Sequence, residues 1–126
     1  MNKRSIVPIN FFTGFGFLVE DAQFFTTRSG RPKVTFRMAL PRNSQLPQKK
    51  PNNSDYYTVV ALGDRFVEMV EHLKRGVPVV VFGYVQSRDV NVNGEQRTAH
   101  EIAASALYIV RPVGSEESEE NERNGN

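Results

Sequence analysis

The chain has 126 residues, of which 39% are hydrophobic, so it has room for one domain with a modest core rather than for two domains. It contains no cysteine, which excludes a disulfide scaffold and a thiolate metal site and fits a reducing compartment. The net charge of +2 is unevenly distributed, since 112–126 holds five acidic residues and one basic residue, which leaves 15 basic and 9 acidic residues in 1–111. A basic body suggests a surface for a polyanion, although basic residues that serve only solubility explain the charge equally well.

The first predicted strand covers Ile6 to Val19. Gly14 and Gly16 interrupt it, and glycine inside a strand often marks the bulge or bend that a small barrel needs. Its phenylalanines fall on both faces of the strand, so both faces need to be covered. Core packing is the expected reason for most of these phenylalanines, and the others could lie at a subunit interface. The basic start superficially resembles an export signal, but polar residues interrupt the apolar run and no cleavage site follows. We therefore expect neither export nor a membrane span.

A connection from Glu20 to Lys33 follows, because Arg28-Ser29-Gly30-Arg31-Pro32 is a strong turn signal. Apolar residues then alternate with others from Val34 to Leu40, which predicts a half-buried strand with Arg37 on its open face. Pro41 to Ser54 is predicted to be a loop, since it holds three prolines and several amides and serines. A basic flap over a phosphate backbone and plain disorder explain this loop equally well.

The middle of the chain predicts a strand, a short helix and a second strand in succession. The ranges 55–63 and 77–90 are rich in β-branched and aromatic residues, as is typical of strands. Between them, 64–75 carries one apolar stripe at helical spacing. Asp64 is expected to cap the helix, and Gly76 to end it in a left-handed conformation. A helix this short needs an apolar surface to lie on, which the flanking strands supply.

The last predicted strand returns along the one before it. Asn93-Gly94 is a favoured hairpin turn, and the returning strand runs from Gln96 to Val110. From Pro112 onward the composition turns to Ser, Glu, Asn and Gly, which cannot bury enough apolar surface to become ordered. We therefore expect a folded domain at 1–111 and a disordered acidic tail at 112–126.

Five strands with one helix between the third and the fourth is the OB-fold order. The predicted fold class is therefore all-β with one helix, a partly open five-stranded barrel of the kind that commonly binds single strands or oligosaccharides. Up to about Val110, the chain resembles the bacterial single-stranded DNA-binding protein family. The resemblance is carried by 55–63, by Glu71-His72-Leu73-Lys74-Arg75-Gly76, by 79–88, by the Asn93-Gly94 turn, and by the spacing of 10–16 and 21–30.

This resemblance implies a non-catalytic protein that binds single-stranded DNA regardless of sequence, in replication, recombination or repair. It also implies a cytoplasmic, nucleoid-associated location, no cofactor, a homotetramer or homodimer, and replication or repair proteins as further partners. Members of the family stack bases on aromatic side chains in a basic groove, and such stacking is worth roughly 1–3 kcal/mol per base.

The chain departs from the family pattern at several of these positions. The family's stacking positions fall on Ser44, Tyr56, Leu62 and Val90, and among these Tyr56 alone is aromatic. Asp64 stands at a basic position, and the tail ends in Arg123-Asn124-Gly125-Asn126 rather than in a hydrophobic tip. These departures imply weaker or differently placed DNA binding, and they put recruitment of partners through the tail in doubt.

The resemblance places Tyr56 in the DNA groove, with Arg37 and Arg88 on adjacent strands near the phosphates. Tyr57 lies on the opposite face of the same strand, because side chains alternate. The other DNA-binding candidates are Lys33, Lys49, Lys50 and Arg97.

Two other classes of function remain as alternatives. An OB-fold interaction module of a replication or primosome-type complex, with weak DNA binding, would explain the missing aromatic residues. An enzyme is the less favoured alternative, because His72 and His100 are the only histidines and neither belongs to a metal-spaced cluster or a nucleophile motif. No catalytic residue and no metal site is therefore expected.

Overall fold

A computed structural model describes residues 6–42 and 53–111. Six strands and one 3-10 helix make up this part of the chain. In chain order they are β1 (Phe12–Leu18), β2 (Gln23–Thr26), β3 (Pro32–Pro41), β4 (Ser54–Leu62), η2 (Asp64–His72), β5 (Pro78–Val92) and β6 (Glu95–Ile109). The predicted tail at 112–126 and most of the predicted loop at 41–54 lie outside the described residues.

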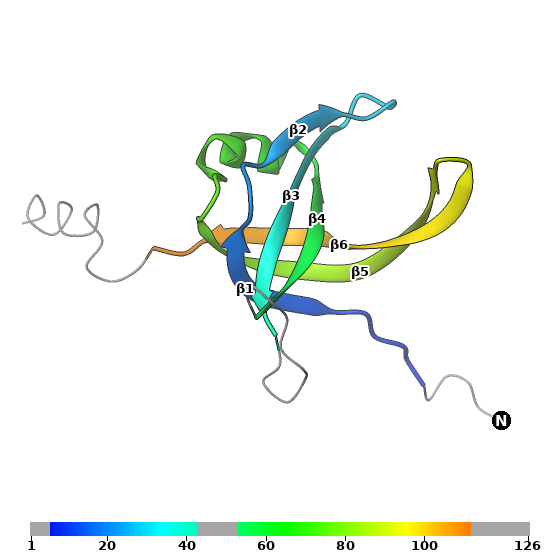
Figure 1. The fold of residues 1–126 in the computed structure, drawn as a ribbon. Helices are drawn as coiled ribbons and strands as arrows, with labels where there is room; N and C mark the ends of the chain where they lie inside the picture. Colours follow the sequence, from blue (N-terminus) through cyan, green and yellow to red (C-terminus); the bar gives the residue numbers. More distant parts are fainter. Residues whose placement is uncertain (1–5, 43–52, 112–126) are drawn as a thin grey trace, which may run out of the picture.

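Five of the strands form a closed ring (Figure 1). Their order is β1-β5-β6-β4-β3, and β1 pairs a second time with β3, where Phe17 and Leu18 lie opposite Ala39 and Met38. At this crossing a β-carbon on Gly16 would collide with the carbonyl oxygen of Ala39, so the closure requires glycine there. β4 and β6 are parallel, and the other neighbours are antiparallel. The predicted OB-fold is confirmed.

The start of the chain differs from the prediction in two ways. β1 begins at Phe12 rather than at Ile6, because the side-chain amide of Asn10 takes the place of backbone pairing: its Nδ2 donates to the carbonyl oxygen of Val85 (2.7 Å) and its Oδ1 accepts from the Val85 N–H (3.0 Å). The predicted connection at 20–33 contains a sixth strand, β2, which pairs with β3 alone. All four β2 residues are exposed, so no alternation of apolar and polar residues marks it.

The barrel core follows the predicted alternation. On β3 the buried side chains are Val34, Phe36 and Met38, with Arg37 exposed between them. The other members of the core cluster are Leu18, Val59, Ala61, Phe66, Leu73, Val79, Val81, Ile102 and Leu107. Burial of side chains of this size contributes roughly 1.5–3 kcal/mol each, so this cluster is the main source of the fold's stability.

The helix keeps its predicted apolar stripe but not its predicted type or ends. η2 is a 3-10 helix that ends at His72, three residues before the predicted end. Gly63 occupies the N-cap position and no side chain caps the helix, so the prediction for Asp64 is wrong. The chain leaves the helix at Leu73, whose side chain is fully buried. Gly76 has the predicted positive φ, 86°, and its N–H bonds to the carbonyl oxygen of Leu18 (2.8 Å), which ties this turn to β1.

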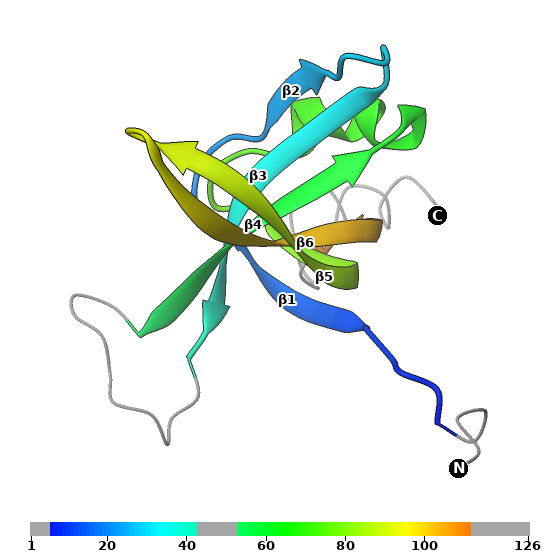
Figure 2. The ribbon, with the colours of Figure 1, turned by 90° about the vertical axis from the view of Figure 1, so that its right-hand side faces the viewer.

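Two hairpins extend beyond the barrel, and the paired ends of β3 and β4 project from it in another direction (Figure 2). One consists of β2 and β3, and the other of the outer halves of β5 and β6. Asn93 and Gly94 join β5 to β6 in the predicted hairpin turn, and their φ values of 53° and 81° are the two positive values of type I′. In the strand order, β4 lies between the two hairpins.

Candidate nucleic-acid interface

The side chains of β3, β4, β6 and β5 that point away from the core form one continuous surface, which we call the outer face. The strand register aligns two rows across all four strands: Thr35, Val60, Ala103 and Tyr84, then Arg37, Thr58, Glu101 and Gln86. In OB-folds the surface over the second and third barrel strands, here β3 and β4, with the loops at its sides, is where oligonucleotides bind. The outer face is therefore the candidate interface.

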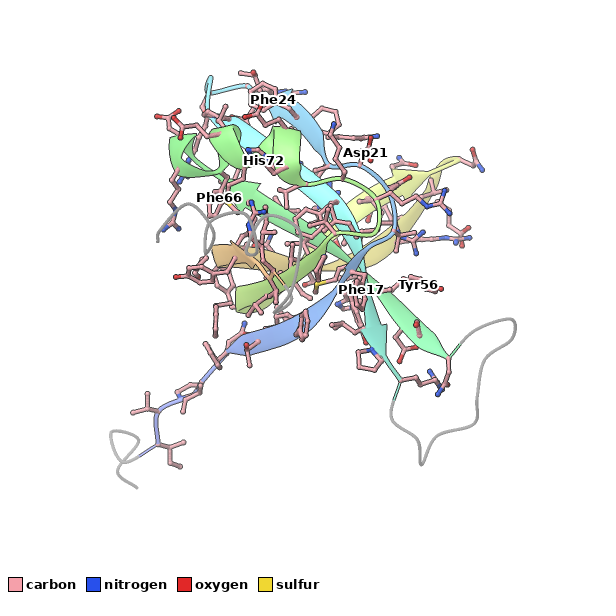
Figure 3. All side chains as sticks on the ribbon, turned by 90° about the vertical axis from the view of Figure 1, so that its left-hand side faces the viewer. Phe17, Asp21, Phe24, Tyr56, Phe66 and His72 are labelled. Carbon is pink, nitrogen blue, oxygen red and sulfur yellow. The ribbon has the colours of Figure 1, made fainter. Side chains whose placement is uncertain are left out.

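Tyr56 lies on this face, the side on which the resemblance placed it, and Tyr57 lies on the other. It stands opposite Ala39 on β3, one row beyond Arg37. The guanidinium carbon of Arg37 lies 5.4 Å from the centroid of the Tyr56 ring, within the range of a cation–π contact. Figure 3 shows Tyr56 outside the barrel, where β3 and β4 project from it. An aromatic surface and a positive charge thus lie side by side, which suits a base and its phosphate.

Lys33 also belongs to the outer face, where it stands between two apolar neighbours. It pairs with Leu62 on β4 and with Phe25 on β2. Phe25 therefore points to the same side as Lys33, and it is 46% exposed. Phe25 was missed because 20–33 was predicted to be a connection.

Arg88 lies on the outer face but its charge is shared with a carboxylate. Its Nε is 3.3 Å from Oε2 of Glu101, and Nε2 of Gln86 donates to Oε1 of the same residue (2.9 Å). The Glu101 side chain is only 6% exposed, whereas that of Arg88 is 56% exposed. A buried carboxylate thus holds a predicted phosphate ligand at the side of the interface, which weakens the attraction of Arg88 for DNA.

Replacing Glu101 by glutamine should therefore strengthen single-strand binding. The change keeps the side chain's size and one acceptor oxygen, which can still accept from Nε2 of Gln86. It replaces the other oxygen by an NH2 group and removes the negative charge, which frees Arg88 for one more phosphate. Because each phosphate contact contributes about −0.7 to the slope of log affinity against log salt, the slope should steepen by about 0.7. A fluorescence titration of oligodeoxythymidine at several salt concentrations measures both quantities.

Glu95→Gln is the matched control, because Glu95 is exposed at the hairpin tip and its partner Arg97 is already exposed. This variant should leave the slope nearly unchanged. If Glu101→Gln also kept the parent slope, Arg88 would not reach the phosphates.

The remaining predicted residues divide into two groups. Arg97 lies on the β5–β6 hairpin, where its Nη2 is 3.2 Å from Oε2 of Glu95, an exposed pair of little energetic value. Lys49 and Lys50 lie outside the described residues. Among the candidates, the structure therefore brings Lys33, Arg37 and Tyr56 together, with Arg88 at the side.

Three further outer-face residues were not predicted. Tyr84 on β5 is 45% exposed, and Arg31 and Arg65 line the same hollow as Tyr84. Tyr84 could have been predicted, because it lies four residues before Arg88 on the same strand and so points to the same face. Arg31 and Arg65 lie in a turn and at the start of η2, where sequence spacing does not indicate a direction.

Three further observations concern the described residues away from the outer face. No group of three or more His, Cys, Asp or Glu side chains that could hold a metal occurs within 6–42 and 53–111. A hollow of about 680 Å³ lies between β2 and η2, but Phe24, Met69 and His72 line it, away from the outer face (Figure 3). None of the helical segments in the described ranges has the length and apolarity to cross a membrane.

The chain is similar to proteins of known structure. The Plasmodium falciparum SSB in its complex with ssDNA superposes with a TM-score of 0.70 at 19% identity, covering 88% of this chain and 100% of that one. The small single-stranded DNA-binding protein from Streptomyces coelicolor gives a TM-score of 0.59 at 25% identity, covering 79% and 93%. Among curated proteins no similar sequence is found. The family model for the single-strand binding protein family matches residues 9–110, and the chain therefore belongs to this family of non-catalytic DNA-binding proteins.

Proposed function

We propose that this single-stranded DNA-binding protein holds its strand on the outer face, regardless of sequence, in replication, recombination or repair. The observation that carries the proposal is the contact between Arg37 and Tyr56 on the part of the outer face that β3 and β4 form. Every base offers a flat surface and every nucleotide a phosphate, so these contacts select single strands without reading the bases. Duplex DNA hides its base faces by stacking, and we therefore expect it to bind far more weakly.

A competition experiment tests this function. Protein bound to a labelled oligodeoxythymidine should release it to unlabelled single strands of other composition at similar concentrations, whereas a duplex of the same length should compete poorly. We also propose that the chain has no catalytic activity, so the strands should be recovered intact. Competition by duplex as strong as that by single strands would contradict the proposal, and no binding to either would favour a protein-interaction module.

We also propose that the chain forms a homodimer or homotetramer through β1. Phe15 and Phe17 point outward from β1, each is 53% exposed, and their rings lie 6.2 Å apart. Ile6, Val7, Ile9 and Phe11 continue this exposed apolar surface toward the N-terminus. An apolar surface next to a strand edge is typically covered by a second copy.

Light scattering at micromolar concentration should accordingly give a dimer or tetramer mass for the parent protein. A charge in place of Phe17 would be buried without a partner, so Phe17→Glu should yield monomers. Phe25→Asp is the control, since Phe25 is similarly exposed but lies on β2, and it should keep the parent mass. A monomeric parent would refute the proposal.

A further inference from the structure

A second hollow opens on the outer face beside Tyr84. It has a volume of about 210 Å³. The side chains that line it are Arg31, Val60, Leu62, Arg65, Tyr84, Gln86, Ala103, Ala104 and Ser105. Pockets for drug-sized ligands measure about 300–1,000 Å³, so this hollow suits one planar ring system rather than a longer ligand.

The hollow exists because small side chains surround the Tyr84 ring. The cross-strand neighbour of Tyr84 on β6 is Ala103, and the neighbour of Ala103 on β4 is Val60. No large side chain in this row covers the ring, which is 45% exposed. Small apolar side chains and an aromatic ring thus lie together in the lining, the arrangement on which a base stacks.

The charges around the hollow are all positive. Arg31 and Arg65 line it, and none of its lining residues is acidic. Neither arginine belongs to an ion pair within the described residues. Two guanidinium groups beside a pocket for a base are placed to bind the phosphates on either side of that nucleotide.

We propose that this hollow is a pocket for one unpaired nucleobase, which stacks on Tyr84 while Arg31 and Arg65 hold its phosphates. The proposal rests on the proposed function and adds a second stacking site to Tyr56. Leu62 stands at one of the family's stacking positions but is not aromatic, and it lines this hollow. In the proposed pocket, Tyr84 on β5 supplies the aromatic surface that Leu62 lacks.

A comparison of two strands isolates the stacking contact. On oligodeoxythymidine, Tyr84→Ala should bind about 5- to 150-fold more weakly than the parent. On an abasic deoxyribose-phosphate strand of the same length, the two proteins should bind equally, because no base remains to stack. Tyr84→Phe keeps the ring and should bind like the parent, and Tyr84→Leu, which keeps an apolar side chain without an aromatic surface, should lose affinity as alanine does.

Tyr57→Ala is the matched control, since Tyr57 is also exposed but lies on the opposite face of β4, at a pocket formed with Phe12 and His100. It should not change the affinity. If the parent binds oligodeoxythymidine but the Tyr84 variants bind equally well, the pocket is wrong and the proposed function stands. An equal loss on both strands would show that Tyr84 supports the fold rather than a base, and a parent that binds neither strand would overturn the function itself.

Discussion

Replacing Tyr56 by alanine is expected to weaken the binding of oligodeoxythymidine about 5- to 150-fold, the effect of losing roughly 1–3 kcal/mol of stacking. Tyr56 contributes an aromatic surface but no charge, so the slope of log affinity against log salt should hardly change. Arg37 keeps its place on β3 but loses its cation–π contact with the ring, whose centroid lies 5.4 Å from the guanidinium carbon. Fluorescence titrations at several salt concentrations measure both quantities.

The neighbouring residue provides the control for this change. Tyr57 is on the same strand but its side chain points to the other face, so Tyr57→Ala should bind like the parent. If Tyr56→Ala stays folded and keeps the parent affinity, DNA does not cross Tyr56. The strand would then run elsewhere, over the aromatic surface of β1 or the basic segment 42–50.

The barrel could be predicted because its core strands alternate in a simple pattern. Val34, Phe36 and Met38 are buried and the residues between them are not, which is the pattern of a sheet with one covered face. Likewise, Phe66 on η2 is buried, and Met69 and Val70 from the same apolar stripe pack against the core. In both elements the local pattern and the final packing agree, so no knowledge of the rest of the chain is needed.

β2 could not be predicted in this way, because its contacts are made by the backbone. Residues 23–26 are all exposed, and β3 alone holds them in the sheet. Phe25 consequently had no predicted direction. The 3-10 geometry of η2 is a similar case, since the apolar stripe fixes which side faces the core but not which backbone hydrogen bonds form.

The pairing of Glu101 with Arg88 and Gln86 was within reach of the sequence. Counting outward from the Asn93-Gly94 turn pairs Gln86 with Glu101 and Tyr84 with Ala103, as the structure shows. The count fails only at the irregularity between Phe82 and Gly83. The position of Arg88 along β5 correctly predicts which face its side chain points to. Whether its charge is neutralised by a neighbouring carboxylate can be predicted only once β6 is aligned with β5.

The central claim is that phosphates lie along the outer face. Arg31, Lys33, Arg37 and Arg65 occupy this face, and none of them has an ion-pair partner within 6–42 and 53–111. If each contacts one phosphate, the slope of log affinity against log salt should be about −3, and affinity should fall about 50-fold between 50 and 200 mM salt.

The most direct measurement compares this slope among three proteins: the parent, the double variant Lys33→Ala/Arg37→Ala, and the control Lys74→Ala/Arg75→Ala. The control removes the same charge from exposed positions beside Asp21, beyond the end of η2. We predict that the first double variant has a slope about 1.4 shallower than the parent, and that the control keeps the parent slope. A parent slope near zero, or a full slope in Lys33→Ala/Arg37→Ala, would contradict the assignment of the outer face.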